Sequence, residues 1–392
     1  MVKIKQDIID SSWNTHKNKL SKKLFQRSQL LRKMILKLIE CKNDAPTFKA
    51  WFKNEAEDFS KKQVSINLFL KSGKKIQSLD NLDNLDNLQD PENLDLELSD
   101  NTKDTITAIV DFLTEEKVIS ILVETPKNLS GLNTDFVNVT TRYDQNLVKK
   151  VLEFIFDYES FTNKASAGVY DAYQLTENLE VEACLYCNRN FIQTVSNEKS
   201  KLIRPELDHF FPKKDYPLLR LSFYNLIPSC HICNSNLKGS DDFDHEKAFH
   251  PYLGSFDDYS VYFSFKPNNV DAFTNPKFEN FDIRVNYDDL SNVKMKSKIK
   301  KNVECFRLDE IYNYNKTYAL EIKEIADVTN GNYIKSIKEK VMIDKDGKQI
   351  FKSAEEVYKR VMLNYYKPEE YYKRPLSKFI KDLMVEFKLI ER

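Results

Sequence analysis

Apolar residues recur at helical spacing along most of the chain. In the N-terminal segment, lysine and arginine lie between them, which predicts an amphipathic helix with a basic face. Further helices are predicted over about 105–180, including Gln145–Phe156 and Ala167–Leu175. A last helix begins just after Pro375, because proline favours the first turn of a helix. The apolar positions behind these predictions are Leu20, Leu24, Leu31, Ile35, Leu38, Ile106, Ile109, Val110, Leu113, Leu376, Phe379, Ile380, Leu383, Phe387 and Ile390.

Two stretches depart from the helical pattern. The run at Tyr259–Phe265 alternates like a strand, and the central part of the chain is irregular. We therefore predict an α+β fold with a mostly α-helical body. The expected segments are a basic helical N-terminal region (1–78), an acidic linker or loop (79–104), a helical region (105–180), an irregular central domain (181–260) and a mainly helical C-terminal region (261–392).

Composition narrows the class of protein. Only 7 of the 392 residues are glycine, which argues against glycine-rich phosphate loops and propellers. No apolar run is long enough for a membrane span, and the N-terminus lacks a signal-peptide core, so we expect a cytoplasmic protein. Disulfides are rare in the cytosol, so the 6 cysteines are expected to be thiols or metal ligands.

Charge is balanced overall but unevenly distributed. Lys and Arg total 60, as do Asp and Glu, which excludes a globally basic, histone-like binder. Residues 1–79 nevertheless contain 18 Lys and Arg against 7 Asp and Glu. This basic face could bind nucleic acid or simply be solvated. The acidic Leu-Asp-Asn repeat within 80–100 is interpreted as an exposed loop, or alternatively as a nucleic-acid mimic that restrains a basic surface.

Two Cys-x-x-Cys pairs give the strongest chemical signal. They are 42 residues apart and could close one tetrahedral zinc site through four thiolates. The pair Asp208-His209 lies between them, and two asparagines, Asn225 and Asn234, come later. Cys41 and Cys305 stand alone and are interpreted as small buried hydrophobic residues. The paired cysteines are Cys184, Cys187, Cys230 and Cys233.

Three sequence segments resemble those of a known protein family. CLYCNRNF begins at 184, ELDHFFPK at 206 and SFYNLIPSCHICNSNLKG at 222. Together they resemble an HNH endonuclease of the ββα-metal class with a four-cysteine zinc site, over roughly 184–240. The resemblance implies a strand that ends in Asp-His, a second strand and loop that carry the middle Asn, and a helix that begins near the second Cys pair and carries the last motif residue. The three residues at the positions of the HNH motif are here His209, Asn225 and Asn234.

The chemistry of phosphodiester hydrolysis fits these residue types. Histidine ordinarily titrates near neutral pH, so His209 could take the proton of the attacking water. Asp208, its neighbour on a strand, would point the other way and ligate Mg²⁺ or Mn²⁺ together with Asn234. The cation would stabilise the leaving 3′ oxygen. By resemblance, Asn225 orients the loop or the His209 ring, and the four cysteines hold a structural Zn²⁺.

Basic residues near the cysteine pairs are candidates for phosphate contacts. Arg189, Lys213 and Lys238 are the residues proposed, although each could equally belong to a solvated surface. His250 could approach a phosphate, but a structural histidine is the favoured interpretation. His231 is not needed as a zinc ligand, because four cysteines complete the tetrahedron.

The same phrases narrow the resemblance to standalone HNH effectors of bacterial antiphage systems, Septu-like and retron-associated. This resemblance implies a role in defence and an ATPase protein partner. The expected function is hydrolysis of DNA. Two alternatives stay open: a zinc-braced nucleic-acid-binding module without catalysis, and an HNH nuclease that acts on RNA.

Overall fold

The structure is a computed structural model that describes residues 1–55, 98–163, 169–197, 201–329 and 333–391. It divides into two compact units. Unit 1 comprises residues 1–12, 166–212 and 227–392, and unit 2 comprises residues 13–165 and 213–226. Each unit gathers pieces of several predicted segments, and the segment boundaries stay a prediction. Most of the acidic Leu-Asp-Asn stretch lies outside the described residues.

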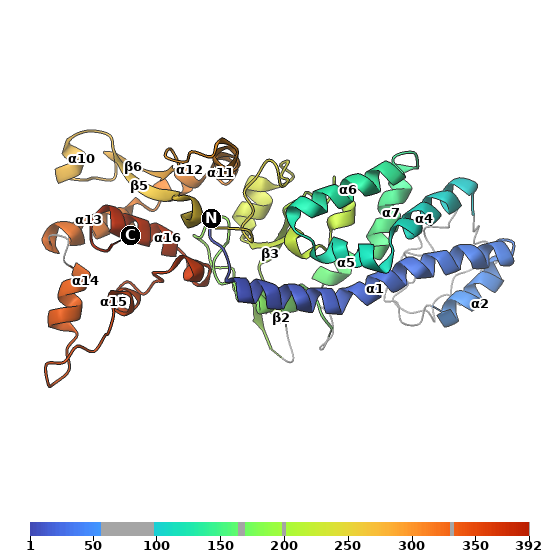
Figure 1. Cartoon of the computed structure of the whole chain (residues 1–392), viewed down its shortest axis with the longest axis horizontal. Coiled ribbons are helices and arrows are strands. Elements are labelled where there is room, and N and C mark those ends of the chain that lie inside the picture. The colour runs from blue at the N-terminus through green and yellow to red at the C-terminus, as the bar shows by residue number, and fades with distance from the viewer. Residues whose placement is uncertain (56–97, 164–168, 198–200, 330–332, 392) are drawn as a thin grey trace. The chain divides into compact units, whose positions relative to one another are not determined.

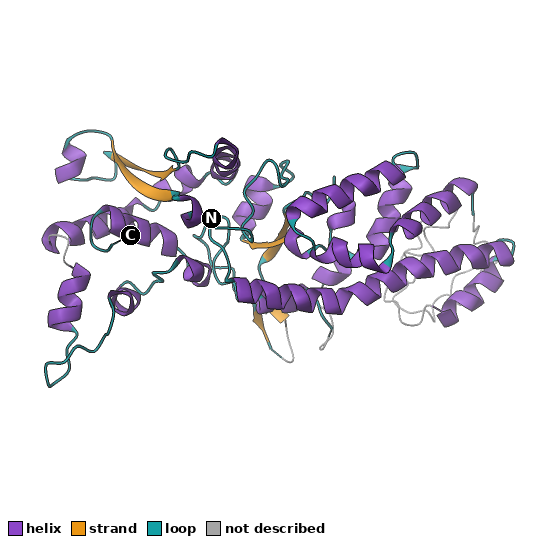
Figure 2. Cartoon of the chain, viewed as in Figure 1, coloured by secondary structure: helices purple, strands orange, loops and turns teal. Residues whose placement is uncertain are grey.

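Unit 2 is helical, and its helices are drawn in purple in Figure 2. The apolar positions predicted for the first two helical stretches are buried there, from Leu20 in α1 to Leu113 after α4, which confirms the periodicity. The elements of this unit are α1 (Gln6–Glu40, from residue 13 on), α2 (Ala45–Glu55), α4 (Asp100–Phe112), α5 (Glu115–Val123), α6 (Pro126–Thr140), α7 (Gln145–Ile155), α8 (Tyr158–Thr162) and the 3₁₀ turns η4 (Pro217–Leu219) and η5 (Phe223–Asn225).

Capping side chains move two helix starts from their predicted positions. Helix α4 begins at Asp100 rather than near 105, because the Ser99 hydroxyl accepts the N–H of Thr102. Helix α9, predicted from 167, begins at Ala172 because the Asp171 carboxylate accepts the N–H groups of the first turn. The predicted helix that starts at Gln145 is confirmed as α7.

Unit 1 combines helices with small two-stranded sheets, so the described residues have the mixed helix and sheet content of an α+β fold (Figure 1). Its strand pairs are β1 (Val195–Ser196) with β2 (Lys201–Ile203), β3 (Glu206–His209) with β4 (Leu226–Ser229, the last three in this unit), and β5 (Tyr262–Pro267) with β6 (Phe281–Asn286). Its helical elements are α9 (Ala172–Asn178), η6 (Ile232–Lys238), η7 (Asp257–Tyr259), α10 (Asp271–Thr274), α11 (Val293–Cys305), α12 (Leu308–Asn313), α13 (Lys316–Thr329), α14 (Tyr333–Ser336), η8 (Ile337–Val341), α15 (Ala354–Val361), η9 (Pro368–Lys373) and α16 (Ser377–Glu386).

The predicted strand and the last helix both shift at their ends. The strand begins at Tyr262 and not at 259, because the 3₁₀ turn η7 and Ser260, with φ of 54°, come first. Helix α16 confirms the last predicted helix but ends at Glu386. Its buried face includes Phe379 and Leu383, whereas Phe387 and Ile390 lie beyond the helix.

Helix side chains cover both edges of the β5–β6 sheet. Alternate N–H groups of a strand lie about 6.6 Å apart on one edge, and helix positions i and i+4 lie one turn apart, so the two spacings match. Two outward N–H groups on each strand therefore meet a carboxylate or amide oxygen, which hinders pairing of these edges with other strands. The four pairs are Phe263–Asp382 (3.0 Å) and Phe265–Glu386 (2.7 Å) with α16, and Ile283–Asn313 (2.9 Å) and Val285–Asp309 (2.8 Å) with α12.

In the described ranges, no helix has both the length and the apolar character that a membrane crossing requires.

Candidate metal centre and the polar cluster beside it

Four cysteine sulfur atoms converge in unit 1. The Sγ atoms of Cys184, Cys187, Cys230 and Cys233 all lie within 4.8 Å of one another, and all four residues are buried. A tetrahedral thiolate centre with Zn–S bonds of about 2.3 Å needs sulfurs at this spacing. The group could therefore hold a metal ion such as zinc, in agreement with the ligand set predicted from the Cys-x-x-Cys pairs.

Hydrogen-bond donors surround the sulfurs. The Cys230 N–H lies 3.3 Å from Cys184 Sγ, the Asn190 side-chain amide lies 3.2 Å from Cys230 Sγ, and the Arg189 N–H lies 3.4 Å from Cys187 Sγ. Such donors stabilise thiolate charge around a metal. Burial raises the pKa of the Cys184 thiol, whereas hydrogen bonds from the other sulfurs lower the pKa of Cys230. The cluster thus has the burial and the donors of a closed structural site.

Asn188 anchors the first cysteine pair to the C-terminal part of unit 1. Its φ of 51° turns the chain so that its N–H reaches the Cys184 carbonyl at 2.7 Å. Its side-chain amide donates to the Tyr371 carbonyl at 2.8 Å, and its own carbonyl accepts the N–H of Leu376 at 2.6 Å. Asparagine tolerates this left-handed backbone better than most residues. The one sequence signal of this role is the Asn directly after the second Cys, and the role was not predicted from it.

The strand β3 and the short helix η6 pack against each other beside the cysteines. Side chains two apart on a strand share a face, so Glu206 and Asp208 both point toward η6. On η6, a π-helical turn, Asn234 and Ser235 contact Glu206, and Lys238 contacts Asp208. The structure therefore joins the Asp-His strand to the helix that begins within the second cysteine pair.

Asp208 is buried, and each of its two carboxylate oxygens accepts a hydrogen bond. It is 2% exposed. Its Oδ1 accepts from Lys238 Nζ at 2.9 Å and its Oδ2 accepts from the Tyr186 hydroxyl at 2.6 Å. Lys238 also donates to the His209 carbonyl at 2.7 Å and lies over the Phe243 ring. Burial, with Asp208 beside it, raises the pKa of Tyr186, so the phenol remains a hydrogen-bond donor.

The Glu206 carboxylate accepts three hydrogen bonds, two from residues of η6 and one from His231, which directly precedes this helix. It accepts from His231 Nδ1 at 2.7 Å, Asn234 Nδ2 at 2.8 Å and the Ser235 hydroxyl at 2.9 Å. Burial alone would raise the pKa of Glu206, but these hydrogen bonds outweigh it and hold the pKa below its ordinary value. Glu206 was not among the residues that the sequence analysis singled out.

The other predicted histidines and asparagine are placed as follows. His209 ends β3 and is 8% exposed. Asn225 lies in unit 2, where its side chain donates to the Leu219 carbonyl at 2.8 Å and so holds the loop between η4 and η5. His250 is buried, with its ring centroid 4.4 Å from that of Phe210 and its Nδ1 accepting the Tyr252 N–H. These are contacts of a structural histidine.

The three proposed phosphate-binding residues differ in exposure. Arg189 is half-buried beside the cysteines. Lys213 is an exposed residue of unit 2, with its ammonium 5.6 Å from the centre of the Tyr158 ring. Lys238 is buried, and a phosphate contact there would require its ammonium to leave Asp208 and the His209 carbonyl. Phosphate binding by these residues stays a prediction.

The oxygen atoms near β3 fit the chemistry of a hard cation. Carboxylate oxygens come from Asp208, and an amide oxygen comes from Asn234. The Asn234 Oδ1 accepts no hydrogen bond from any residue that the structure describes. The ammonium of Lys238 already neutralises Asp208, however, so a cation that binds this carboxylate must compete with it.

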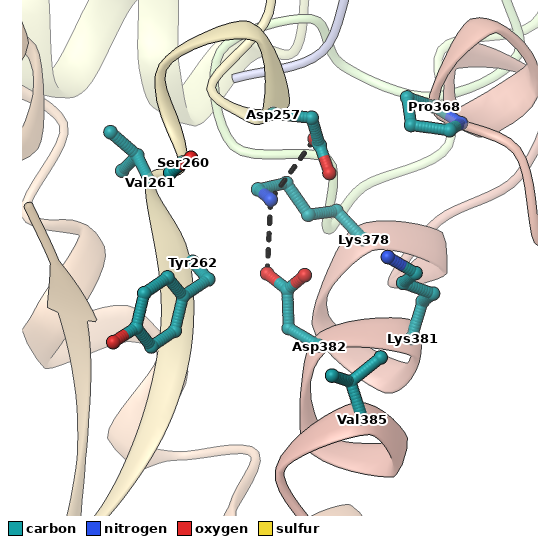
Figure 3. Close-up of a pocket in the computed structure, with 9 residues that line it drawn as sticks. All are labelled: Asp257, Ser260, Val261, Tyr262, Pro368, Lys378, Lys381, Asp382 and Val385. Carbon is teal, nitrogen blue, oxygen red and sulfur yellow. Dashed lines mark ion pairs between the residues drawn. The ribbon is translucent and has the colours of Figure 1, made fainter. Parts of the chain in front are cut away.

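A second charged cluster lies in unit 1 on α16 (Figure 3). It lines a cavity of about 200 Å³, and the buried ammonium of Lys378 lies 3.0 Å from carboxylate oxygens of both Asp257 and Asp382. Burial alone would lower the pKa of Lys378, but the two carboxylates outweigh it and raise the pKa. Because Asp382 also holds the β5 edge, these ion pairs tie α16 to the turn η7 and to the sheet.

Two known proteins are similar to parts of the chain. It is 30% identical to protein ea31 of Escherichia phage lambda over 152 residues, which cover 38% of the chain and 46% of the phage protein. It is 38% identical to Septu protein PtuB of Bacillus thuringiensis over 68 residues, which cover 17% of the chain and 23% of that protein. No family model and no solved structure matches the chain. The chain thus aligns with less than half the length of each relative.

Proposed function

We propose that the chain is a metal-dependent HNH endonuclease that hydrolyses DNA phosphodiester bonds. One observation carries this proposal: the strand with Asp208 and His209 packs on the helix with Asn234, and the four-cysteine cluster lies at the start of that helix. This order of two paired strands and a helix is the one that the HNH resemblance implies.

In the proposed reaction, His209 accepts a proton from a water molecule, whose oxygen attacks the phosphorus while the bond to the 3′ oxygen breaks. Asp208 and Asn234 are the residues that would hold a divalent cation. When bound, the cation supplies positive charge to the phosphate and to the leaving oxygen. Asn225 is proposed to orient the loop or the His209 ring. The four cysteines are proposed to hold Zn²⁺ and to fix the helix.

The similarity to Septu protein PtuB supports a further proposal about biological role. We place the chain among nuclease effectors of bacterial antiphage defence that act with an ATPase partner.

A second candidate function is a zinc-braced nucleic-acid-binding module without catalysis. The contacts of Asp208 favour it, because Lys238 and Tyr186 already occupy the carboxylate. An HNH nuclease that acts on RNA is a third candidate, since phosphate contacts carry no sequence information and are made on either nucleic acid.

The test is cleavage of supercoiled plasmid, and of a labelled RNA of similar length, by the purified chain with Mg²⁺ or Mn²⁺. The His209→Ala variant is expected to lose about 10²–10⁴-fold in rate, the usual contribution of a general base. His245→Ala is the matched control, because His245 pairs with the adjacent Glu246 and lies outside the proposed site. Zinc content and the melting temperature should not change in either variant.

Equal cleavage by wild type and His209→Ala contradicts the assigned base. Binding of DNA without turnover, by a zinc-loaded wild type alone and with a candidate ATPase, favours the binding module. Cleavage of RNA but not of plasmid contradicts the DNA substrate and favours the HNH nuclease that acts on RNA.

A further inference from the structure

In the hydrogen bond between Glu206 and Asn234, the chemistry of the two groups decides which side chain is the donor. An ionised carboxylate has no hydrogen to donate, so the Asn234 side chain must present its NH₂ group to Glu206. Glu206 accepts two further hydrogen bonds, from His231 and Ser235, and these hold its carboxylate in place. An asparagine beside a neutral partner could turn its amide over, but beside this carboxylate it cannot do so without losing the bond.

The same contact decides where the amide oxygen points. With Nδ2 bonded to Glu206, Oδ1 lies on the other side of the amide, and no described residue donates to it. The residue is half-buried, so water or a cation can reach this oxygen. Hard cations bind amide oxygens and never the amide nitrogen, so the orientation of this one amide determines whether Asn234 can be a ligand.

We propose that Glu206 is a positioning residue that locks the side chain of Asn234 with Oδ1 presented as a ligand for a divalent cation. The proposal rests on the function proposed above and adds to it a residue outside the positions of the HNH motif. Three hydrogen bonds hold the Glu206 carboxylate against Asn234 and its neighbours, and the part assigned to Glu206 is to orient this ligand.

Glu206→Gln separates orientation from packing. Glutamine keeps the size of the side chain and can still bond to Asn234, but it can offer either its oxygen or its NH₂ group. The amide of Asn234 is then free to present either end. Loss of such an outer partner of a metal ligand typically costs about 10–100-fold in metal affinity. Ser235→Ala is the matched control, because it removes one hydrogen bond to the same carboxylate and leaves the bond to Asn234.

Mn²⁺ binding to the zinc-loaded full chain is the primary readout, measured by the electron paramagnetic resonance signal of free Mn²⁺. Plasmid cleavage gives kcat and KM beside it. We expect Glu206→Gln to weaken Mn²⁺ binding about 10–100-fold and to lower kcat at unchanged KM for DNA, while Ser235→Ala stays within a few-fold of wild type. Zinc content and melting temperature should be kept.

The outcomes separate this proposal from the proposed function. Cleavage and Mn²⁺ affinity equal to wild type in Glu206→Gln overturn the role of Glu206 and leave the nuclease proposal standing. A wild type that neither binds Mn²⁺ nor cleaves overturns both. If Glu206→Gln loses zinc, Glu206→Asp replaces it, since it keeps the charge but shortens the reach to Asn234. Unchanged Mn²⁺ affinity in that folded variant overturns the proposal in the same way.

Discussion

Lys238 Nζ lies 2.9 Å from Asp208 Oδ1, and each side chain is at most 2% exposed. The pair joins η6 to β3 and neutralises the one carboxylate of the Asp-His pair. A buried ion pair is costly to break, because removing one partner leaves the other charge without compensation. Lys238 was predicted to contact phosphate, and in the structure its ammonium is paired with Asp208 inside the candidate site.

Lys238→Met is expected to destabilise unit 1 by about 3–5 kcal/mol, because Asp208 then keeps only the Tyr186 hydroxyl as partner. Urea unfolding of the zinc-loaded chain measures this loss. Added Mn²⁺ should stabilise the variant more than wild type, since the ammonium no longer competes for Asp208.

Lys301→Met is the matched control for Lys238→Met. Both ammonium groups lie over the Phe243 ring, at 5.5 Å and 5.2 Å from its centre, and each pairs with an aspartate. The Lys301–Asp241 pair is about one-third exposed, so its loss should cost only about 0–1 kcal/mol. Equal losses in the two variants would show that burial of the Lys238–Asp208 pair does not matter.

The four-cysteine cluster should bind one Zn²⁺ per chain, and its removal should unfold unit 1. Structural zinc contributes about 10–16 kcal/mol of apparent binding free energy, as much as or more than the stability of a typical domain. Cys230→Ser should lose zinc and its cooperative thermal transition, as should wild type treated with a strong chelator. Cys41→Ser should keep both, because Cys41 lies in the turn after α1 and outside the cluster. Retention of zinc and of the transition by Cys230→Ser would refute the assignment.

Acid should destabilise unit 2 through His16. Burial lowers the pKa of His16 to about 4 from its ordinary 6.5, although a 2.7 Å contact with the Leu221 carbonyl opposes the shift. Between pH 4 and pH 6.5, His16 is therefore protonated in the unfolded chain but neutral in the folded chain. The unfolding free energy should therefore fall by about 3 kcal/mol as the pH drops from 6.5 to 4.

His16→Gln tests this assignment, because glutamine can still donate to the Leu221 carbonyl but does not titrate. Urea unfolding at a series of pH values should give the variant a shallower pH dependence than wild type, with the difference confined to pH 4–6.5. Parallel curves for the two proteins would assign the acid sensitivity to other groups.

The sequence predicted local features better than their spatial partners. Helical spacing correctly marked Leu20–Leu38 and Ile106–Leu113 as buried faces, because periodicity reports which side of a helix avoids water. Helix starts were displaced where a side chain capped the first turn, as Ser99 and Asp171 do. A single Ser or Asp is a weak signal in sequence, so such boundaries shift by several residues.

The cysteine ligand set was readable from sequence because ligand type and spacing alone are enough to propose a tetrahedral centre. The sequence also singled out Asp208, His209 and Asn234 by their order. It could not reveal that Glu206 faces Asn234 or that Lys238 neutralises Asp208. Those contacts depend on the packing of β3 against η6, which brings together residues about 30 positions apart in the chain. Only the tertiary structure decides such pairs, because strand register and helix rotation are set by the whole core rather than by the local sequence.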